Sequence, residues 1–161
     1  MAQLLIVYHS RTGGSRQMAE AAHDAARAEA DSRLLSADEA GPDDLLGADG
    51  YLFCAPENLA AISGVMKDFF DRCYYPVLGL IEGRAYAQMV CAGSDGANAA
   101  RQIARIAQGW RLKPVQEPLI VCTHAQTPEA ILAPKTIPQQ DLTTCREIGQ
   151  ALAAGLAMGA F

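Results

Sequence analysis

Strand and helix patterns alternate from one end of this 161-residue chain to the other, which predicts an α/β fold with a three-layer, doubly wound parallel sheet. Short apolar runs rich in β-branched or aromatic residues recur, and Ala-rich or amphipathic helical patterns separate them. No internal repeat or long linker interrupts the alternation. Right-handed crossovers in such a sheet place the ligand beyond the carboxyl ends of the strands.

The first three strands are expected at Gln3–Tyr8, Arg33–Ser36 and Gly50–Cys54. The first of them is short, apolar and aromatic at its end, as expected of a buried parallel strand. A narrow apolar stripe predicts a helix from Gly14 to Ala30. The segment Asp38–Leu46 is acidic and rich in turn residues, so it is expected to form turns.

In the middle of the chain, Ser63 is expected to cap a helix that carries apolar residues on one side. The apolar run Ala85–Ala92 predicts the fourth strand. A helical pattern follows at Asn98–Gly109, and its inward face is expected to include Trp110.

The last third of the chain predicts one more strand and one more long helix. Pro118–Cys122 is the fifth expected strand. Thr127 and Pro128 then begin a short helix or turn, because Thr caps helices and Pro is preorganised at the first helical position. A final amphipathic helix is expected after a cap at Asp141.

Length and composition predict a single domain that spans residues 1–161. Apolar residues make up 50% of the chain and charged residues 19%, which excludes disorder, and no apolar run approaches the roughly 18 residues of a membrane span. Met1-Ala2-Gln3 lacks a basic n-region, so no signal peptide is predicted. We therefore expect a cytoplasmic protein with no membrane partner.

Charge and cysteine content argue against nucleic-acid, disulfide and metal sites. The 13 Lys and Arg are scattered and are outnumbered by 18 Asp and Glu, which gives a net charge of −5. The cysteines are odd in number, with neither a C-x-x-C motif nor Cys/His pairing at ligand spacing. We expect buried, reduced thiols, no metal ion and no nucleic-acid partner.

The turn Ser10-Arg11-Thr12-Gly13-Gly14-Ser15 follows the first strand and precedes a helix. Free N–H groups and the positive end of a helix dipole favour an anion at such a turn. Its glycines let the backbone curl around a ligand, and its three hydroxyl groups can donate to phosphate oxygens. Ordinary turn and capping chemistry is the alternative, but the place directly after the first strand favours a phosphate site.

Two further loops are expected at the same edge of the sheet, after the third and fourth strands. The second loop contains Pro56, Glu57, Asn58 and Leu59, and the third contains Ser94, Asp95 and Gly96. Their backbone amides and polar side chains suit a planar, multiply hydrogen-bonded ring better than a second phosphate. Ordinary turn chemistry is the alternative for each loop alone, but the convergence of three loops favours a shared ligand.

Together these motifs resemble the flavodoxin-like superfamily, and within it the NAD(P)H-dependent FMN reductase and NAD(P)H:quinone oxidoreductase group, over nearly the whole chain. The first loop is similar to the family's [ST]-x-T-G-x-[ST] phosphate loop. Ala55–Asn58 and Ser63–Arg72 are similar to its second flavin loop and the helix that follows, and Gly93–Gly96 lies where its third loop belongs. The resemblance implies a five-stranded sheet with the flavodoxin-like order 2-1-3-4-5.

The resemblance also implies that FMN is the cofactor and NADH or NADPH the reductant. The phosphate would be held by Ser10, Arg11, Thr12, Gly13, Gly14 and Ser15. The isoalloxazine would lie between Pro56, Glu57, Asn58 and Leu59 on one side and Ser94, Asp95 and Gly96 on the other. Relatives commonly place an aromatic residue and a glycine where this chain has Leu59-Ala60-Ala61, which predicts a stiffer loop and a less covered ring.

The function expected is that of an FMN-dependent oxidoreductase that passes hydride or electrons from NAD(P)H to a quinone, a flavin or another small acceptor. The cofactor carries the chemistry, so no catalytic acid or base is assigned. The alternative is a flavodoxin-type electron carrier with protein partners, although carriers tend to be strongly acidic. A phosphoryl receiver would need carboxylates for Mg²⁺ at the end of the first strand, where Tyr8-His9-Ser10 offers none.

Members of this group often form homodimers or homotetramers with the flavin near the interface. The aromatic pairs Phe69-Phe70 and Tyr74-Tyr75 are the candidates in this chain for such a surface.

Overall fold

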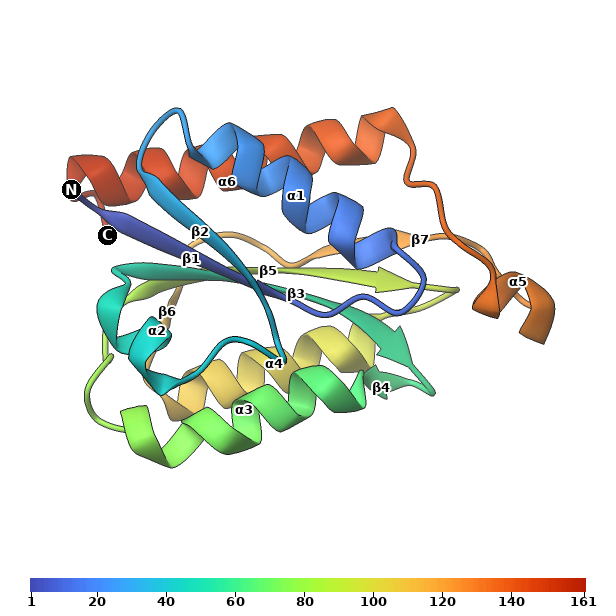
Figure 1. Cartoon of the computed structure of the whole chain (residues 1–161), viewed down its shortest axis with the longest axis horizontal. Coiled ribbons are helices and arrows are strands. Elements are labelled where there is room, and N and C mark those ends of the chain that lie inside the picture. The colour runs from blue at the N-terminus through green and yellow to red at the C-terminus, as the bar shows by residue number, and fades with distance from the viewer.

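A parallel sheet in the expected order forms the middle layer of the computed structural model, which describes residues 1–161 (Figure 1). The strands follow one another across the sheet as β2 (Asp31–Ser36), β1 (Gln3–Tyr8), β3 (Gly50–Asn58) and β5 (Ala85–Ala92). Two short strands, β6 (Lys113–Pro114) and β7 (Leu119–Cys122), both pair with β5 and complete the edge. Because β5 and β7 are the fourth and fifth expected strands, the order 2-1-3-4-5 is confirmed.

Helices cover both faces of the sheet (Figure 1). On one face lie α1 (Gly14–Ala26) and α6 (Gln139–Met158); on the other lie α2 (Pro42–Gly47), α3 (Gly64–Val77) and α4 (Ala97–Gly109). The short helix α5 (Pro128–Leu132) projects beyond the carboxyl end of the sheet, at the right of Figure 1. As expected, Thr127 caps α5, because its hydroxyl accepts a hydrogen bond from the Ala130 amide at 3.2 Å.

Two apolar cores hold the layers together, one on each face of the sheet. Alternate residues of β1 enter different cores, Leu4 and Ile6 on the α1 and α6 face and Leu5 and Val7 on the other, so the strand is apolar throughout. The core under α3 and α4 is aromatic. There, as expected, Trp110 is fully buried, and its indole N–H donates to the Tyr74 carbonyl at 3.0 Å.

The aromatic pairs expected on an interface lie in two different places. Phe69 and Phe70 are buried in the core, with ring centroids 5.2 Å apart, so they do not form a surface. Tyr74 stacks on Trp110, and of this group Tyr75 is the most exposed, at 79%. The sequence alone does not show which of two adjacent aromatic residues on a helix faces the sheet.

Helices α1 and α6 approach each other so closely that one contact point has room only for glycine. A Cβ atom on Gly149 would lie 2.2 Å from the carbonyl oxygen of Ala22. Both residues are buried in the core on that face, where α1 contributes mainly alanines. Small side chains thus let the two helices pack directly against each other.

Three expected element boundaries were wrong. Helix α1 ends at Ala26, not Ala30, because a turn follows in which the amides of Glu29 and Ala30 both donate to the Ala26 carbonyl. The acidic segment 38–46 contains a helix, α2, since Pro42 occupies its first turn and the Asp44 carboxylate accepts from the Gly41 amide at 2.9 Å. Helix α6 begins at Gln139, so Asp141 lies in its first turn rather than at its cap.

A fourth boundary changes the second expected loop. Strand β3 does not stop at Cys54 but continues to Asn58, because Ala55 and Pro56 still pair with Val90 and Cys91 of β5. Its last two residues then pair with β4 (Ala61–Ile62) as a hairpin. The expected loop is therefore largely strand, which fixes its backbone.

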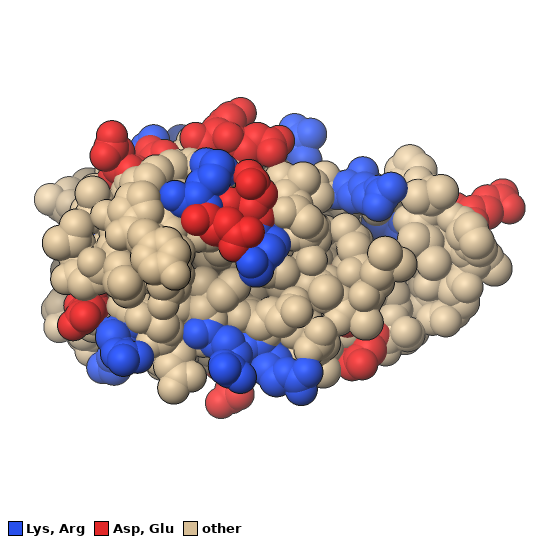
Figure 2. All heavy atoms as spheres, turned by 90° about the horizontal axis from the view of Figure 1, so that it is seen from below, with Lys and Arg blue, Asp and Glu red and all other residues tan.

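Acidic and basic side chains are interspersed on the face that α3 and α4 cover, with much uncharged surface between them (Figure 2). Ion pairs one helical turn apart join Lys67 to Asp71 and Arg72 to Asp68 on α3. None of the helices combines the length and the hydropathy needed to cross a bilayer.

Replacing Gly149 with alanine is expected to lower the free energy of unfolding by about 1–3 kcal/mol, the usual cost of overpacking a core. Urea unfolding followed by circular dichroism measures the change. Gly64→Ala is the matched control, because a Cβ there has no other atom within 4 Å and the residue lies in the first turn of α3. Equal unfolding free energies for the two variants would contradict the close approach of α1 and α6.

Candidate functional site

A cavity of about 350 Å³ lies at the carboxyl edge of the sheet, a volume typical of small-molecule sites. The carboxyl ends of β3 and β5 and the segments that follow β1, β3, β5 and β7 form its walls. The sequence-predicted residues that line it are Ser10, Arg11, Thr12, Gly14, Ser15, Pro56, Glu57, Asn58, Leu59 and Ser94. The topology thus brings all three predicted loops to one cavity.

Gly13, Asp95 and Gly96 do not line the cavity but shape the turns beside it. Gly13 and Gly96 occupy the N-cap positions of α1 and α4 in left-handed conformations, with φ of 96° and 84°. The Asp95 carboxylate accepts from the Ala97 amide at 3.2 Å, as a turn residue does. These residues set the direction in which each helix leaves its loop.

The loop after β1 presents unpaired donors to the cavity. The Ser10 hydroxyl accepts from the Gly13 amide at 3.0 Å and holds the loop in shape, while α1 has no side-chain cap on its first amides. The Ser15 hydroxyl is 1% exposed and has no hydrogen-bond partner. A buried hydroxyl without a partner is costly, so this loop is built to receive an acceptor from outside the chain.

The second wall of the cavity is the hairpin of β3 and β4. Its turn residues Leu59 and Ala60 both have positive φ, 52° and 64°, which costs non-glycine residues roughly 1 kcal/mol or more each. The hairpin is held from α4, where Asn98 donates to the Ala60 carbonyl at 2.6 Å and Gln102 accepts from the Ile62 amide at 2.9 Å. The strained turn is thus fixed by its neighbours.

Glu57 joins the second wall to the third loop. Its carboxylate accepts from the Gly96 amide at 2.7 Å and so joins the end of β3 to the N-cap of α4. The carboxylate is therefore engaged in holding two loops together. The expected contacts of Glu57 and Gly96 with the ring stay predictions.

A fourth wall was missed by sequence reasoning. It comprises Thr123, Ala125, Gln126, Ile131, Leu132 and Lys135, together with Cys91 from β5. The sequence could have indicated this wall, because the segment after the fifth strand leaves the sheet at the same edge as the three predicted loops. Lys135 also contacts the first loop, where its ammonium lies 3.3 Å from the Thr12 hydroxyl.

Cys91 closes the cavity behind the first loop. A Cβ on Gly14 would lie 2.6 Å from the Cys91 sulfur, so the glycine lets α1 approach β5. Burial raises the pKa of Cys91 to about 11, against a smaller opposite effect of Lys135. The thiol is therefore protonated at neutral pH. No group of three or more His, Cys, Asp and Glu side chains is placed to hold a metal ion.

His9 lies beneath the first loop and does not line the cavity. Its Nδ1 is 2.8 Å from the Ser63 hydroxyl, which the sequence had suggested as a cap for α3. Ser63 does hold the N-cap position, but its side chain makes no capping bond. Burial lowers the pKa of His9, Asp38 opposes that shift and Arg11 adds to it.

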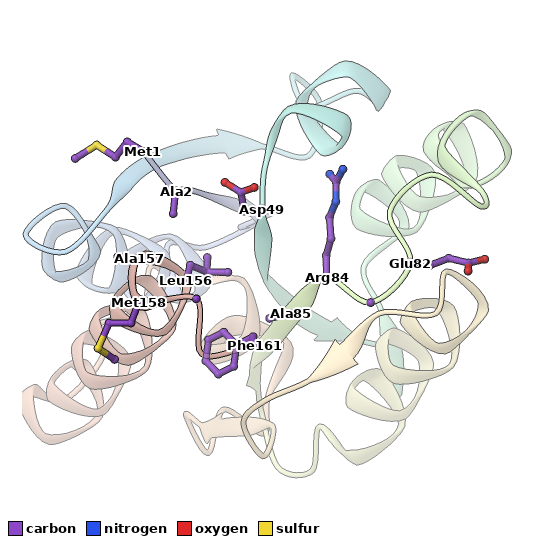
Figure 3. Close-up of a pocket in the computed structure, with 12 residues that line it drawn as sticks. Met1, Ala2, Asp49, Glu82, Arg84, Ala85, Leu156, Ala157, Met158 and Phe161 are labelled. Atoms are coloured by element: carbon purple, nitrogen blue, oxygen red, sulfur yellow. The ribbon is translucent and has the colours of Figure 1, made fainter.

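A second and larger hollow, of about 800 Å³, lies at the opposite edge of the sheet near both chain ends (Figure 3). Two of its polar side chains already serve the fold, because Asp49 accepts from the Gln3 amide and Arg84 donates to the carbonyls of Leu45 and Ala48. Figure 3 shows Arg84 pointing away from Phe161. Size alone does not make this hollow a binding site.

Comparison with known proteins places the chain in a family. The model of the "NADPH-dependent FMN reductase" family matches residues 39–127, more than half of the chain. The chain belongs to this family. The family consists of flavin-binding oxidoreductases with FMN as cofactor, and its name implies NADPH as reductant.

Individual relatives agree with this membership. A flavodoxin of Aquifex aeolicus is 37% identical over 97 residues, 59% of this chain and 50% of that protein. An NAD(P)H dehydrogenase (quinone) of Acidithiobacillus ferrooxidans is 33% identical over 94 residues, 45% of this chain and 47% of that protein. The chain spans about half the length of these curated relatives.

Solved structures share the fold of the family. The flavodoxin, WrbA-like protein from Agrobacterium tumefaciens superimposes with a TM-score of 0.74 over 99% of both chains, at 20% identity. This similarity confirms the expected flavodoxin-like architecture.

The residues at the cavity fit FMN. The partnerless Ser15 hydroxyl and the uncapped amides of α1 match a phosphate, which offers only acceptors. The adjoining walls, with Pro56, Leu59 and Leu132, offer apolar area for a ring. One cavity therefore holds both kinds of surface that this cofactor requires.

Ser15→Ala is expected to raise the free energy of unfolding of the flavin-free chain by up to about 1 kcal/mol, because it removes a buried hydroxyl without a partner. Chemical denaturation after removal of bound flavin measures this change. Ser63→Ala is the matched control, because the Ser63 hydroxyl is equally buried but hydrogen-bonded, and its loss should cost about 1 kcal/mol. A destabilised Ser15→Ala chain would show that the hydroxyl has a partner.

Stability is expected to fall as the pH drops through and below about 6.5, the ordinary pKa of histidine. Burial lowers the pKa of His9 in the folded chain, so the unfolded chain binds the proton first and acid favours unfolding. His9→Asn should flatten the decrease, as measured by urea unfolding across this range. Burial also lowers the pKa of His23, which therefore contributes to the same decrease in stability. The unfolding free energy of the double variant at positions 9 and 23 should depend least on pH. A profile for His9→Asn parallel to that of the unchanged chain would refute the assignment.

Proposed function

We propose that the chain is an FMN-dependent oxidoreductase that takes electrons from NADH or NADPH and passes them to a quinone or another small acceptor. The observation that carries this proposal is the buried, partnerless hydroxyl of Ser15, a residue that lines the same cavity as the walls suited to a ring. The family match and the relative named NAD(P)H dehydrogenase (quinone) support the same function.

The flavin would be held at two ends of the cavity. Its phosphate would lie in the loop of residues 10–15, where Ser10, Thr12 and Ser15 and the first amides of α1 face it. Its ring would lie between Pro56–Leu59 and Ser94, with Asp95 and Gly96 acting through the shape of the third loop. The segment 123–135 would close the remaining side.

When bound, FMN supplies the hydride and electron chemistry itself. The chain binds and orients it. Burial keeps the Cys91 thiol protonated at neutral pH, and the Glu57 carboxylate accepts a hydrogen bond from the Gly96 amide. We assign no catalytic acid or base to the chain.

An apolar acceptor suits the rim of the cavity. Leu59 is fully exposed at the hairpin turn, and Ile131 and Leu132 of α5 are exposed as well. All three residues line the cavity, so a planar, weakly polar molecule could contact them while it approaches the ring. This feature supports a quinone more than a highly charged acceptor.

An electron carrier of the flavodoxin type is the second candidate, favoured by the Aquifex relative. The composition of the cavity argues against it, because no aromatic residue lines the walls. Carriers tend to stack the flavin between aromatic rings, whereas the hairpin turn here carries Leu59 and Ala60. The reductase is therefore the preferred function.

Domain organisation and assembly stay predictions. We propose that residues 1–161 act as one FMN-binding domain that associates as a homodimer or homotetramer. Phe69 and Phe70 cannot contribute to the interface because they are buried, whereas Tyr75 is available.

The decisive test is the visible spectrum of the purified, FMN-reconstituted chain before and after NADPH or NADH is added without oxygen. We expect a flavin band that NAD(P)H bleaches and that a quinone restores, with continued NAD(P)H oxidation when quinone is in excess. Ser15→Ala should retain less FMN after gel filtration, and Ser63→Ala should retain as much as the unchanged chain.

Two other outcomes separate the candidates. A flavin band that resists NAD(P)H but is reduced stepwise by a chemical reductant would favour the electron carrier. A chain that retains no flavin under any condition would contradict both functions.

A further inference from the structure

The chain that returns from α5 to α6 lies against the loop that follows β1 (Figure 1). We call residues 133–137 the strap. The Lys135 amide donates to the Thr12 carbonyl at 2.8 Å, although 123 residues separate them in sequence. Gln17 fastens the strap from α1, since its side chain donates to the Lys135 carbonyl at 2.7 Å and accepts from the Ile137 amide at 3.0 Å. The strap is thus a fixed part of the first loop's surroundings.

The ammonium of Lys135 is held at the cavity without a counter-ion. It lies 3.3 Å from the Thr12 hydroxyl and donates to the Ile131 carbonyl at 2.8 Å and to the Ala133 carbonyl. All these partners are neutral oxygens, and none of the ion pairs of the chain includes Lys135. A half-buried positive charge of this kind favours an anion beside it.

The side chain of Lys135 lies beside the first turn of α1, and its ammonium reaches Thr12, which precedes that turn. A Cβ on Gly14 would lie 3.7 Å from the Cβ of Lys135, so the lysine stem runs beside the uncapped amides of the helix. Arg11 is the other cation that lines the cavity, but it is exposed, whereas Lys135 is fastened by its hydrogen bonds. Lys135 is therefore the preorganised cation of the site.

We propose that Lys135 neutralises the terminal phosphate of FMN and makes the site selective for the phosphorylated flavin over the unphosphorylated one. This inference rests on the proposed flavin site. A chain with a net charge of −5 repels a phosphate dianion, and a fixed local cation offsets that repulsion. The contact to Thr12 is the longest of the ammonium's three, so that donor is the one released to a phosphate oxygen.

The test compares two ligands that differ only in the phosphate. Dissociation constants of FMN and of riboflavin are measured by quenching of flavin fluorescence for the unchanged chain, Lys135→Met and Lys135→Arg. Lys113→Met is the matched control, because it removes the same charge from an exposed site on β6, at the opposite edge of the sheet. We expect Lys135→Met to weaken FMN about ten- to hundredfold and to leave riboflavin unchanged. Lys135→Arg should recover most of the FMN affinity, and Lys113→Met should change neither ligand.

A second measurement covers the case in which riboflavin binds too weakly to quantify. The dissociation constant of FMN should rise with salt concentration, and the slope should be shallower for Lys135→Met than for Lys113→Met. Unaltered riboflavin affinity, or an unaltered thermal transition, shows that a variant is folded.

The result that would overturn the proposal is an equal loss of FMN and riboflavin affinity in Lys135→Met, because Lys135 would then act only by holding the strap. An unchanged FMN affinity and salt slope would overturn it too. An unchanged chain that binds neither flavin would refute the proposed function and, with it, this inference.

Discussion

Parallel hydrogen bonding of β3 to both β1 and β5 is the constraint on which the position of the cavity depends. Leu52 pairs with Ile6 on one side and with Ala87 on the other, so all three strands end at the same edge of the sheet. A slip of one residue would move Phe53 out of the aromatic core and turn Leu52 toward it. The buried pattern on both faces thus fixes the register, and the register fixes where the loops meet.

Local patterns predicted the parts of the site that local chemistry determines. Ser10 to Ser15 could be identified because the donors are adjacent in sequence and follow a recognisable strand. The hairpin could not, since Pro56 and Asn58 are common turn residues, and only the pairing of Pro56 with β5 and of Asn58 with β4 makes them strand. The role of Lys135 could not be predicted from its neighbours in sequence, because it depends on the contact with Thr12, far away in the chain. Long-range contacts, not propensities, decided both cases.

The Ser15 hydroxyl links ligand binding to the stability of the fold. Without a partner it stays buried at a free-energy cost, and any molecule that supplies an acceptor removes that cost only in the folded chain. Binding to the folded state alone stabilises it by mass action. The first turn of α1 is therefore less stable in the chain alone than in a chain whose Ser15 hydroxyl has found an acceptor.

The two long walls of the cavity differ in how firmly the rest of the chain holds them, and the hairpin of β3 and β4 is the more firmly held. Asn98 and Gln102 lie one turn apart on α4. They form hydrogen bonds to the tip of the hairpin and to its second strand, respectively. These hydrogen bonds join the hairpin to α4, which packs on the sheet. The facing helix α5 buries none of its residues. A ligand that fills the cavity therefore meets one wall that hydrogen bonds from α4 hold in place and one wall whose helix is exposed to solvent.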